Sequence, residues 1–325
     1  MRRRSFIGLL GGAAAAWPLA ARAQQTAVPV IGFLNGGTPE DSWVAALRQG
    51  LNDAGYVEGR NVAIEYRWAQ GQYERLPAIA ADLVRRQVTM MIASSTPAAL
   101  AAKAATATIP IVFTTGDDPV KLGLVASLSR PSGNITGVTS LNVGVAPKLI
   151  DLLHEMVPNV TVIALLVNPA NSAQAESTTR EAQIAALRLG LKLHVLHASA
   201  EREFDAAFAS AVQLHAGALA VGPDIFFNTR AEQLGALVFR HSIPAILPYR
   251  ESAAAGALMS YGTNIPSLFR QVGVYSSRVL KGEKPADLPV QQAVKLELVI
   301  SLKTAKALGV DVPMSMLIRV DKVIE

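Results

Sequence analysis

Short runs of β-branched and aliphatic residues alternate along the chain with longer stretches whose apolar positions recur at helical spacing. The first such series predicts strands over 28–34, 62–66, 89–93, 111–114 and 135–138. Helices are predicted between them, over 40–54, 73–86 and 97–105. This alternation is typical of βαβ units, in which helices cover the faces of a parallel sheet.

A second series follows the first and resembles it. It predicts strands over 162–167, 192–196, 218–221, 245–247 and 258–261, with helices over 172–189, 204–215 and 229–241. Asn35 and Asn168 end equivalent strands 133 residues apart (168 − 35), and Pro110 and Pro244 precede equivalent strands 134 residues apart (244 − 110). A near-constant offset indicates a duplicated unit. We therefore predict an α/β fold of two Rossmann-like lobes, each with a parallel sheet flanked by helices.

The last part of the chain is expected to cross between the lobes. A helix over 265–280, a proline-rich connector over 284–289, a strand over 296–301 and a helix over 302–308 follow the second series. We predict that lobe 1 consists of residues 28–139 plus 262–289, and lobe 2 of residues 140–261 plus 290–325. Two lobes that are joined by several crossings make a hinge of several strands.

Composition favours a folded chain of two domains. The sequence has 325 residues, of which 50% are hydrophobic and 17% charged, so it can bury enough apolar surface to fold. Its length exceeds the roughly 250 to 300 residues at which a single core stops growing. It contains no cysteine, which excludes disulfides, thiolate metal sites and a cysteine nucleophile.

The formal charge of +5 comes mostly from the start of the chain. Three arginines at 2–4 precede an apolar stretch over 6–17, and Ala-Arg-Ala at 21–23 has the small-x-small pattern of a cleavage site. We predict an export signal over 1–23, of the twin-arginine type and cleaved near Ala23; an ordinary secretory signal with surplus arginines is the alternative. Its removal takes away four arginines and leaves a net charge of +1 (5 − 4). The sequence thus predicts a periplasmic protein that binds no nucleic acid.

Small polar residues gather where the predicted strands end. In parallel sheets, ligands bind outside the carboxyl ends of the strands, where helix N-termini present free N–H groups. In this chain those ends hold hydroxyls, amides, glycines and a few acids, at 35–38, 94–96, 115–118, 168–171, 222–224 and 248–251. The same residue types are the preferred helix N-caps, so capping is the alternative for each residue taken singly. For the set as a whole we predict one polar cleft.

Within this cleft, the residue types favour a small charged or aromatic solute. Ser95 and Thr96 could hold a carboxylate at a helix start, and Asp118 or Asp224 could neutralise an ammonium group. Aromatic side chains near the strand ends could stack on a ring, among them Phe33, Trp43, Phe226, Phe227 and Tyr249. Packing in the core is the alternative for Phe33 and Phe226.

No catalytic constellation is recognisable in the sequence. The phosphate-binding P-loop, the G-x-S-x-G elbow and the H-E-x-x-H metal motif are absent. The five histidines are scattered, and none stands at one of these strand ends. Asp117 and Asp118 could act as acid and base, but neighbouring residues rarely face one target. We predict a protein that is not an enzyme and uses no metal or cofactor.

Several stretches of the sequence carry a family resemblance: VIGFLN at 30–35, GYVEGRNV at 55–62, IPIVF at 109–113, DPV at 118–120, GNITGV at 133–138, GALMSYG at 256–262 and LKTAKALG at 302–309. With them, the chain resembles along its whole length the ABC transporter substrate-binding proteins of the family that includes tryptophan-binding lipoproteins. The resemblance implies a type I periplasmic-binding-protein fold. In this fold two lobes close on a small solute and then dock on a permease in the inner membrane.

The resemblance also implies where a ligand would bind. The interlobe positions are Asn35, Ser94, Ser95, Thr96, Thr115, Asp118, Asn168, Asp224 and Tyr249, to which we add Phe226 as an aromatic candidate. The expected ligand is a small polar or carboxylate-bearing solute, either an amino acid or an aromatic acid, and the expected receptor is a monomer. Two other functions stay open, namely an exported sensory module with the same fold and an exported enzyme that uses the same cleft.

Overall fold

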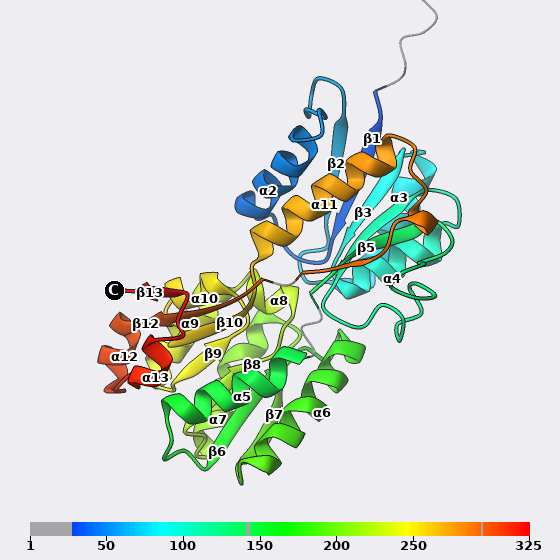
Figure 1. The fold of residues 1–325 in the computed structure, drawn as a ribbon. Coiled ribbons are helices and arrows are strands. Elements are labelled where there is room, and N and C mark those ends of the chain that lie inside the picture. The colour runs from blue at the N-terminus through cyan, green and yellow to red at the C-terminus, as the bar shows by residue number, and fades with distance from the viewer. Residues whose placement is uncertain (1–27, 141–143, 294) are drawn as a thin grey trace, which may run out of the picture.

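The structure, a computed structural model, describes residues 28–140, 144–293 and 295–325. Two lobes lie one above the other in Figure 1, and each is built on one sheet with helices on both faces. The prediction of an α/β fold with two lobes is therefore confirmed. The predicted export signal over 1–23 lies outside the described residues.

The sheet of the first lobe is parallel throughout. Its order is β11-β5-β4-β3-β1-β2, and each pair of neighbours is parallel. The strands are β1 (Val30–Asn35), β2 (Ala63–Trp68), β3 (Met90–Ser94), β4 (Ile111–Thr115), β5 (Ile135–Thr139) and β11 (Gln291–Gln292). Because all of them run in one direction, their carboxyl ends meet at one edge of the sheet.

The sheet of the second lobe contains one reversed pairing. Its order is β13-β12-β10-β9-β8-β6-β7. The strands are β6 (Val162–Val167), β7 (Lys192–His197), β8 (Ala218–Val221), β9 (Ala245–Leu247), β10 (Met259–Thr263), β12 (Leu296–Ser301) and β13 (Lys322–Ile324). β12 pairs antiparallel with β10, so the prediction of a wholly parallel sheet was wrong at this point. The chain leaves β10 for the first lobe and returns at the same edge, so it enters β12 in the opposite direction.

Four helices cover the first sheet. α2 (Asp41–Asn52) and α11 (Ile265–Leu280) pack on one face, and α3 (Leu76–Arg85) and α4 (Thr96–Ala105) pack on the other. Successive residues of a strand point to opposite faces. Accordingly, Phe33 belongs to the core under α2 and α11, and Leu34 to the core under α3 and α4. Burial on both faces explains why the strands are short continuous apolar runs.

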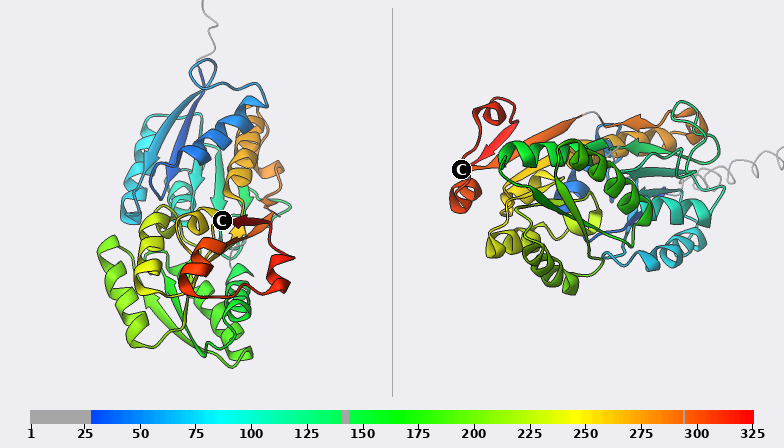
Figure 2. Two further views of the ribbon diagram at one scale, coloured as in Figure 1. Left: turned by 90° about the vertical axis from the view of Figure 1, so that its left-hand side faces the viewer. Right: turned by 90° about the horizontal axis from the view of Figure 1, so that it is seen from below.

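The second sheet is covered in the same way. α5 (Val145–Met156) and α6 (Ser172–Arg188) pack on one face, and α7 (Phe204–Gln213) and α9 (Ala231–His241) on the other. Short helices complete the lobe: α8 (Ile225–Asn228), α10 (Arg250–Ala254), α12 (Leu302–Leu308) and α13 (Met314–Leu317). The last two lie beside the C-terminus at the outer side of the second lobe (Figures 1 and 2).

The chain passes between the lobes after β5, after β10 and after β11. β11 pairs with Val138 and Thr139 of β5. The predicted start of the second segment of lobe 2, at residue 290, therefore comes too early for Gln291 and Gln292, which complete the first sheet. The sequence carries no strong signal for such a two-residue strand, because its formation depends on the neighbouring strand.

Some further elements had not been predicted. α5 contains Pro147 in its first turn, where proline is compatible with a helix because the N–H that it lacks would have no partner within the helix. The other unpredicted elements, α8, α10, α13 and β13, have three to five residues and show no full period of a pattern. In the part of the chain that the structure describes, no helix is long and apolar enough to cross a membrane.

Helix α11 returns from the second lobe and packs closely on α2 through glycines. A Cβ atom on Gly50 would lie 2.1 Å from the carbonyl oxygen of Arg270, and one on Gly273 would lie 2.4 Å from that of Leu47. Such distances are far shorter than van der Waals contact, so the two helix backbones touch because both positions lack a side chain. This contact attaches α11, which follows one of the crossings, to the first lobe.

We expect Gly50→Ala to lower the free energy of unfolding by about 1–3 kcal/mol, because the added methyl group must push the two backbones apart. Chemical denaturation of the chain and of the variant measures the difference. Gly144→Ala is the matched control: Gly144 has nothing within 4 Å of its Cβ position and a φ of −69°. Equal stability of the two variants would contradict the close helix contact.

Candidate ligand-binding site

The carboxyl ends of the two sheets enclose a small buried cavity. Its volume is about 60 Å³. Polar residues after β3 and β4 and on α6 line one part of it, and apolar residues of α2, α8 and α11 line another. The lining residues are Trp43, Ser94, Ser95, Thr96, Thr114, Thr115, Gly116, Ser140, Asn171, Gln174, Ile225, Asn228, Tyr249, Ile265, Leu268 and Phe269.

The hydroxyls of the polar part connect to a carboxylate beside it, that of Asp117, which lines the adjoining larger cavity. The Thr96 hydroxyl lies 2.6 Å from that of Thr115 and is 2.8 Å from Oδ2 of Asp117, to which it can donate. Asp117 is only 4% exposed. Burial raises the pKa of Asp117, and hydrogen bonds from Thr96 and from the Ser177 hydroxyl act against this rise. A buried carboxylate whose side-chain partners among the described residues are hydroxyls is suited to receiving a ligand cation.

Ser95 holds a strained backbone conformation at the start of α4. Its φ of 110° and ψ of 156° lie in a region that glycine alone adopts readily. Its side chain accepts a hydrogen bond from the N–H of Ala98 at 3.3 Å and so caps the helix. The oxygen also stands close to the first strand, because a Cβ on Gly36 would meet it at 2.7 Å. Strain of this kind gathers at functional sites.

The apolar part of the cavity is aromatic. The rings of Trp43 and Phe269 stack with their centroids 5.5 Å apart and their planes 19° apart. Both side chains are almost fully buried. Trp43 Nε1 and Asn228 Oδ1 are buried without a hydrogen-bond partner, although both residues line the cavity. Unpaired buried polar atoms are rare in folded proteins, so these two polar atoms are available to hydrogen-bond a ligand.

A second and larger cavity adjoins the first. It has a volume of about 750 Å³ and lies between the lobes, with Asp117 and Lys121 on one side and Ser177 and Arg180 on the other. Ser140 lines both cavities. The Ser177 hydroxyl approaches Oδ1 of Asp117 at 3.4 Å across the gap between the lobes. Both residues of this contact line the larger cavity.

The structure brings together part of the predicted set. Five of the predicted residues line the small cavity: Ser94, Ser95, Thr96, Thr115 and Tyr249. Asp118 lines the larger cavity instead, and its Oδ1 accepts hydrogen bonds from the backbone N–H groups of Val120 and Lys121. The capping alternative predicted a helix start here, but the residues after Asp118 form a turn, which Asp118 stabilises.

The other predicted residues lie outside the lining of the small cavity. Asn35 is fully buried, and its side-chain oxygen accepts from the N–H of Gly37 at 2.7 Å. Asn168 donates to Asp224 at 2.9 Å, and Phe226 packs among other aromatic rings. Asp224 and Phe226 take part in a second contact between the lobes, which is described below.

Several lining residues were not among the predicted set. Phe269, Leu268 and Ile265 come from α11, which the sequence places far from the strand ends of the first lobe. Asn171 and Gln174 stand at the start of α6 and are hydrogen-bonded to each other. From the sequence, Asp117 was a candidate only as an acid–base pair with Asp118. The structure distinguishes the two, because Asp117 is buried and Asp118 is partly exposed. The sequence did contain a signal for the α11 residues. Asn264, the N-cap of α11, directly follows the end of β10, just as the predicted positions follow the ends of other strands.

Among the described residues, no group of three or more histidine, aspartate or glutamate side chains could hold a metal ion. The site therefore consists of hydroxyls, amides, one buried carboxylate and aromatic rings. This chemistry suits the binding of a small organic molecule by hydrogen bonds and ring contacts.

We expect two substitutions of Ser95 to act in opposite directions. Ser95→Gly relieves the backbone strain and should raise the free energy of unfolding by about 1 kcal/mol or more, because glycine costs little as an N-cap. Ser95→Ala keeps the strain but removes the cap, and should lower the same quantity by about 1 kcal/mol. Chemical denaturation of both variants measures the two changes. A loss of stability in Ser95→Gly would show that the backbone is not strained there.

The raised pKa of Asp117 predicts a pH dependence. A carboxyl group whose pKa is higher in the folded protein than its ordinary 3.8 contributes stability at low pH, and this contribution is lost as the pH rises through the folded value. The amide that Asp117→Asn introduces cannot ionise. The stability of this variant relative to the unchanged chain should therefore increase between pH 4 and pH 7, by about 1.4 kcal/mol for each unit of pKa elevation. Denaturation curves at both pH values test this, and a constant or falling difference would contradict it.

Comparison with known proteins is consistent with this geometry. The sequence profile of the family described as "ABC transporter substrate binding protein" matches residues 27–324. The chain is 29% identical over 262 residues to a protein of Clostridioides difficile (strain R20291) named tyrosine-binding protein, an alignment that covers 79% of this chain and 74% of the relative.

Solved structures show the same fold. The structure of an ABC domain from Streptococcus pneumonia in complex with L-Trp superposes with a TM-score of 0.82 at 24% identity. A ligand-free, open substrate-binding protein of Clostridium difficile gives a TM-score of 0.63, also at 24% identity. In both cases 91% of this chain and 99% of the other chain are covered. With a type I periplasmic-binding-protein fold and a family profile that spans nearly its whole length, the chain belongs to the ABC transporter substrate-binding proteins.

Proposed function

We propose that the protein is a periplasmic receptor that captures an amino acid with an aromatic side chain and delivers it to an ABC importer. The observation that carries this proposal is that the cleft between the lobes holds a hydroxyl-rich part, with one buried carboxylate hydrogen-bonded to it from the adjoining cavity, next to an aromatic part. An aromatic amino acid has the same division, between its charged backbone groups and its ring. The proposal extends to this chain what the names of two similar proteins say of those proteins.

The start of α4 is the proposed site for the ligand carboxylate. The first N–H groups of a helix have no partner within it and carry a partial positive charge. In α4, Ser95 already caps the N–H of Ala98 and Pro97 has none, so the N–H of Thr96 is the donor of the first turn that is left for a ligand. The hydroxyls of Ser94 and Thr96 stand beside it.

Asp117 is the proposed partner of the ligand ammonium group. It lies within hydrogen-bond distance of Thr96, so a carboxylate at the start of α4 and an ammonium at Asp117 can belong to one α-amino acid. The pairing would also compensate the buried negative charge of Asp117, which its hydroxyl donors only partly stabilise. The ring of the ligand would then contact Trp43 and Phe269.

Binding requires that the lobes move. A cavity of about 60 Å³ is smaller than the roughly 150 Å³ that accommodates benzene. The ligand must therefore widen the small cavity or extend into the adjoining larger one. The higher TM-score with the tryptophan-bound structure than with the open one agrees with a closed arrangement of the lobes in this chain. Opening at the three crossings is the movement that would admit the ligand.

Export and delivery complete the proposal. The predicted signal over 1–23 would carry the protein to the periplasm, where an importer of this class receives its solute from the closed receptor. The family assignment supports a small-molecule ligand and a permease as partners.

We expect L-tyrosine, L-tryptophan or L-phenylalanine to raise the melting temperature of the mature protein. At 100 times the Kd, a ligand stabilises the folded state by about 2.7 kcal/mol. Alanine, which lacks the ring, and 3-(4-hydroxyphenyl)propionate, which lacks the ammonium group, should give smaller shifts. No shift with any aromatic amino acid would contradict the proposed ligand class.

The role of Asp117 can be tested separately from the ligand class. Asp117→Asn should weaken the binding of the aromatic amino acid by about 30-fold or more, because the ligand ammonium loses its charged partner. It should leave the weaker binding of 3-(4-hydroxyphenyl)propionate unchanged, since that compound has no ammonium group. Asp118→Asn makes the same change in charge one residue away and is the control. Titration calorimetry gives the Kd values, and equal losses for both ligands or both variants would contradict the assignment.

A further inference from the structure

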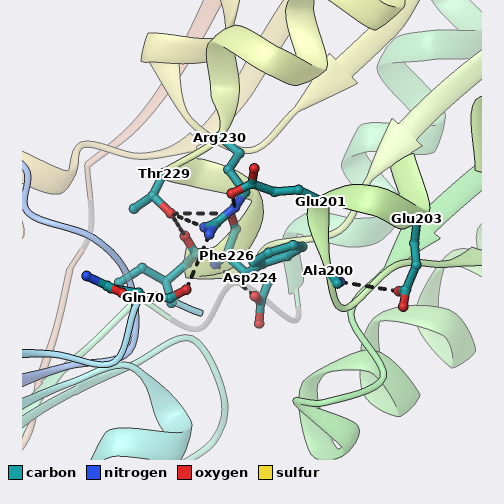
Figure 3. A network of polar contacts seen from close by, with 9 residues as sticks. Gln70, Ala200, Glu201, Glu203, Asp224, Phe226, Thr229 and Arg230 are labelled. Atoms are coloured by element: carbon teal, nitrogen blue, oxygen red, sulfur yellow. Dashed lines mark hydrogen bonds and ion pairs between the residues drawn. The ribbon is translucent and has the colours of Figure 1, made fainter. Parts of the chain in front are cut away.

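The two lobes touch at a second place that is separate from the small cavity. In the first lobe, residues 70–73 follow β2; in the second, residues 224–230 follow β8 and include α8. Figure 3 shows Arg230 of the second lobe reaching Gln70 of the first, with Asp224 and Phe226 close by. We call the contacting residues the latch: Gln70, Gly71 and Tyr73 of the first lobe, and Asp224, Phe226 and Arg230 of the second.

Two hydrogen bonds cross between the lobes within the latch. The Tyr73 hydroxyl donates to Oδ1 of Asp224 at 2.7 Å, and both residues are buried. Arg230 donates from Nη2 to the carbonyl oxygen of Gln70 at 3.3 Å (Figure 3). Each bond joins residues more than 150 positions apart in the sequence. Both would break if the lobes separated here.

Close packing accompanies these bonds. A Cβ on Gly71 would lie 2.8 Å from Cδ2 of Phe226, so the glycine backbone rests directly on that ring. The guanidinium of Arg230 lies over the same ring, 4.3 Å from its centroid. Phe226 and Tyr73 belong to one continuous hydrophobic core that includes residues of both lobes. Separation would expose apolar surface as well as break hydrogen bonds.

Each side of the latch is held in place within its own lobe. On the first lobe, the N–H groups of Gln70 and Gly71 donate to the carbonyl oxygens of Gly37 and Gly36. On the second, Arg230 forms an ion pair with Glu201 at 2.7 Å between Nε and Oε1. The turn and the guanidinium are thus positioned before they meet, which reduces the entropy that closure costs.

Asp224 is held most firmly. Besides Tyr73, it accepts hydrogen bonds from the side-chain amides of Asn168 and Asn171 and from the N–H of Phe226, each at 2.9 Å. Four donors on two oxygens use most of what a carboxylate can accept. Asp224 is therefore occupied by the protein, unlike Asp117, whose side-chain partners among the described residues are hydroxyls.

In the first lobe, the latch lies far from the crossings after β5 and β11. In the first sheet, β5 and β11 adjoin the crossings, whereas β2 is the strand at the opposite edge. Four strand spacings separate β2 from β5, or about 19 Å. None of the latch residues lines the small cavity. A contact at this distance from a hinge has a long lever arm, so it opposes opening effectively while leaving the ligand untouched.

We propose that the latch stabilises the closed arrangement of the lobes directly and thereby sets the affinity for the ligand from outside the ligand site. Its residues are positioning residues, because they act through the position of the lobes. When only a fraction of the molecules is competent to hold the ligand, the apparent Kd equals the intrinsic Kd divided by that fraction. The effect on affinity rests on the proposed function, whereas the effect on lobe position does not.

The test uses two variants that remove the bonds between the lobes; Tyr73→Phe removes little else, whereas Arg230→Gln also removes the ion pair with Glu201 and the contact with the Phe226 ring. Tyr73→Phe removes the hydroxyl that reaches Asp224, and Arg230→Gln removes the charge and most of the guanidinium. Tyr275→Phe is the matched control, because the Tyr275 hydroxyl donates to the Pro289 carbonyl at 2.7 Å and no residue of the latch takes part. Circular dichroism and denaturation establish that each variant is folded.

Lobe position can be read without any ligand. The chain contains no cysteine, so Glu74→Cys and Arg202→Cys provide two unique spin-label sites. Both residues line a groove of about 510 Å³ beside the latch, one from each lobe. We expect the distribution of distances between the labels to shift to longer values in Tyr73→Phe and in Arg230→Gln, and to stay unchanged in Tyr275→Phe. An unchanged distribution in both folded latch variants would overturn the proposal.

Affinity is the second measurement. The apparent Kd for the best-binding aromatic amino acid should rise about tenfold in Tyr73→Phe, as expected for the loss of one hydrogen bond to a carboxylate. Longer label distances with an unchanged Kd would overturn the link between the latch and affinity. If no amino acid binds the unchanged chain, the proposed function fails, and the label distances still decide whether the latch holds the lobes together.

Discussion

The structure depends on one constraint, which is that the carboxyl edges of two sheets face each other. Strand ends carry the polar backbone and the helix starts of a parallel sheet, so bringing two such edges together buries many hydrogen-bonding groups at once. The protein satisfies most of them internally, as at Asp224 with its four donors. Around Trp43 and Asn228 it does not. The seam between the lobes therefore contains one region whose polar groups are hydrogen-bonded within the protein and one region with polar groups that a solute could hydrogen-bond.

We propose that one of these regions stabilises closure of the lobes and the other selects the ligand. Contacts that are satisfied within the protein, such as those of Tyr73 and Arg230, favour closure whatever the ligand is. In the proposed mode of binding, the groups at Thr96 and Asp117 would contact the ligand and determine which solute is held. Separating the two allows affinity and specificity to change independently, because a substitution on one side need not disturb the other.

The sequence predicted the fold well because the fold depends on local patterns. The repeat from Asn35 to Asn168 and the short apolar runs identified both lobes. The site was predicted only in part, since its composition depends on which distant segments meet. Phe269 reaches the cavity because α11 returns to the first lobe, and the difference between Asp117 and Asp118 is one of burial. The reversal of β12 likewise follows from the path of the chain between the lobes and leaves no local pattern.

The central claim is that the seam holds an α-amino acid with an aromatic ring. Native mass spectrometry of the mature protein after incubation with an equimolar mixture of the twenty amino acids tests it most directly. The account predicts one bound molecule per chain whose mass is that of tyrosine, tryptophan or phenylalanine. A bound amino acid without a ring, or no bound amino acid at all, would contradict it.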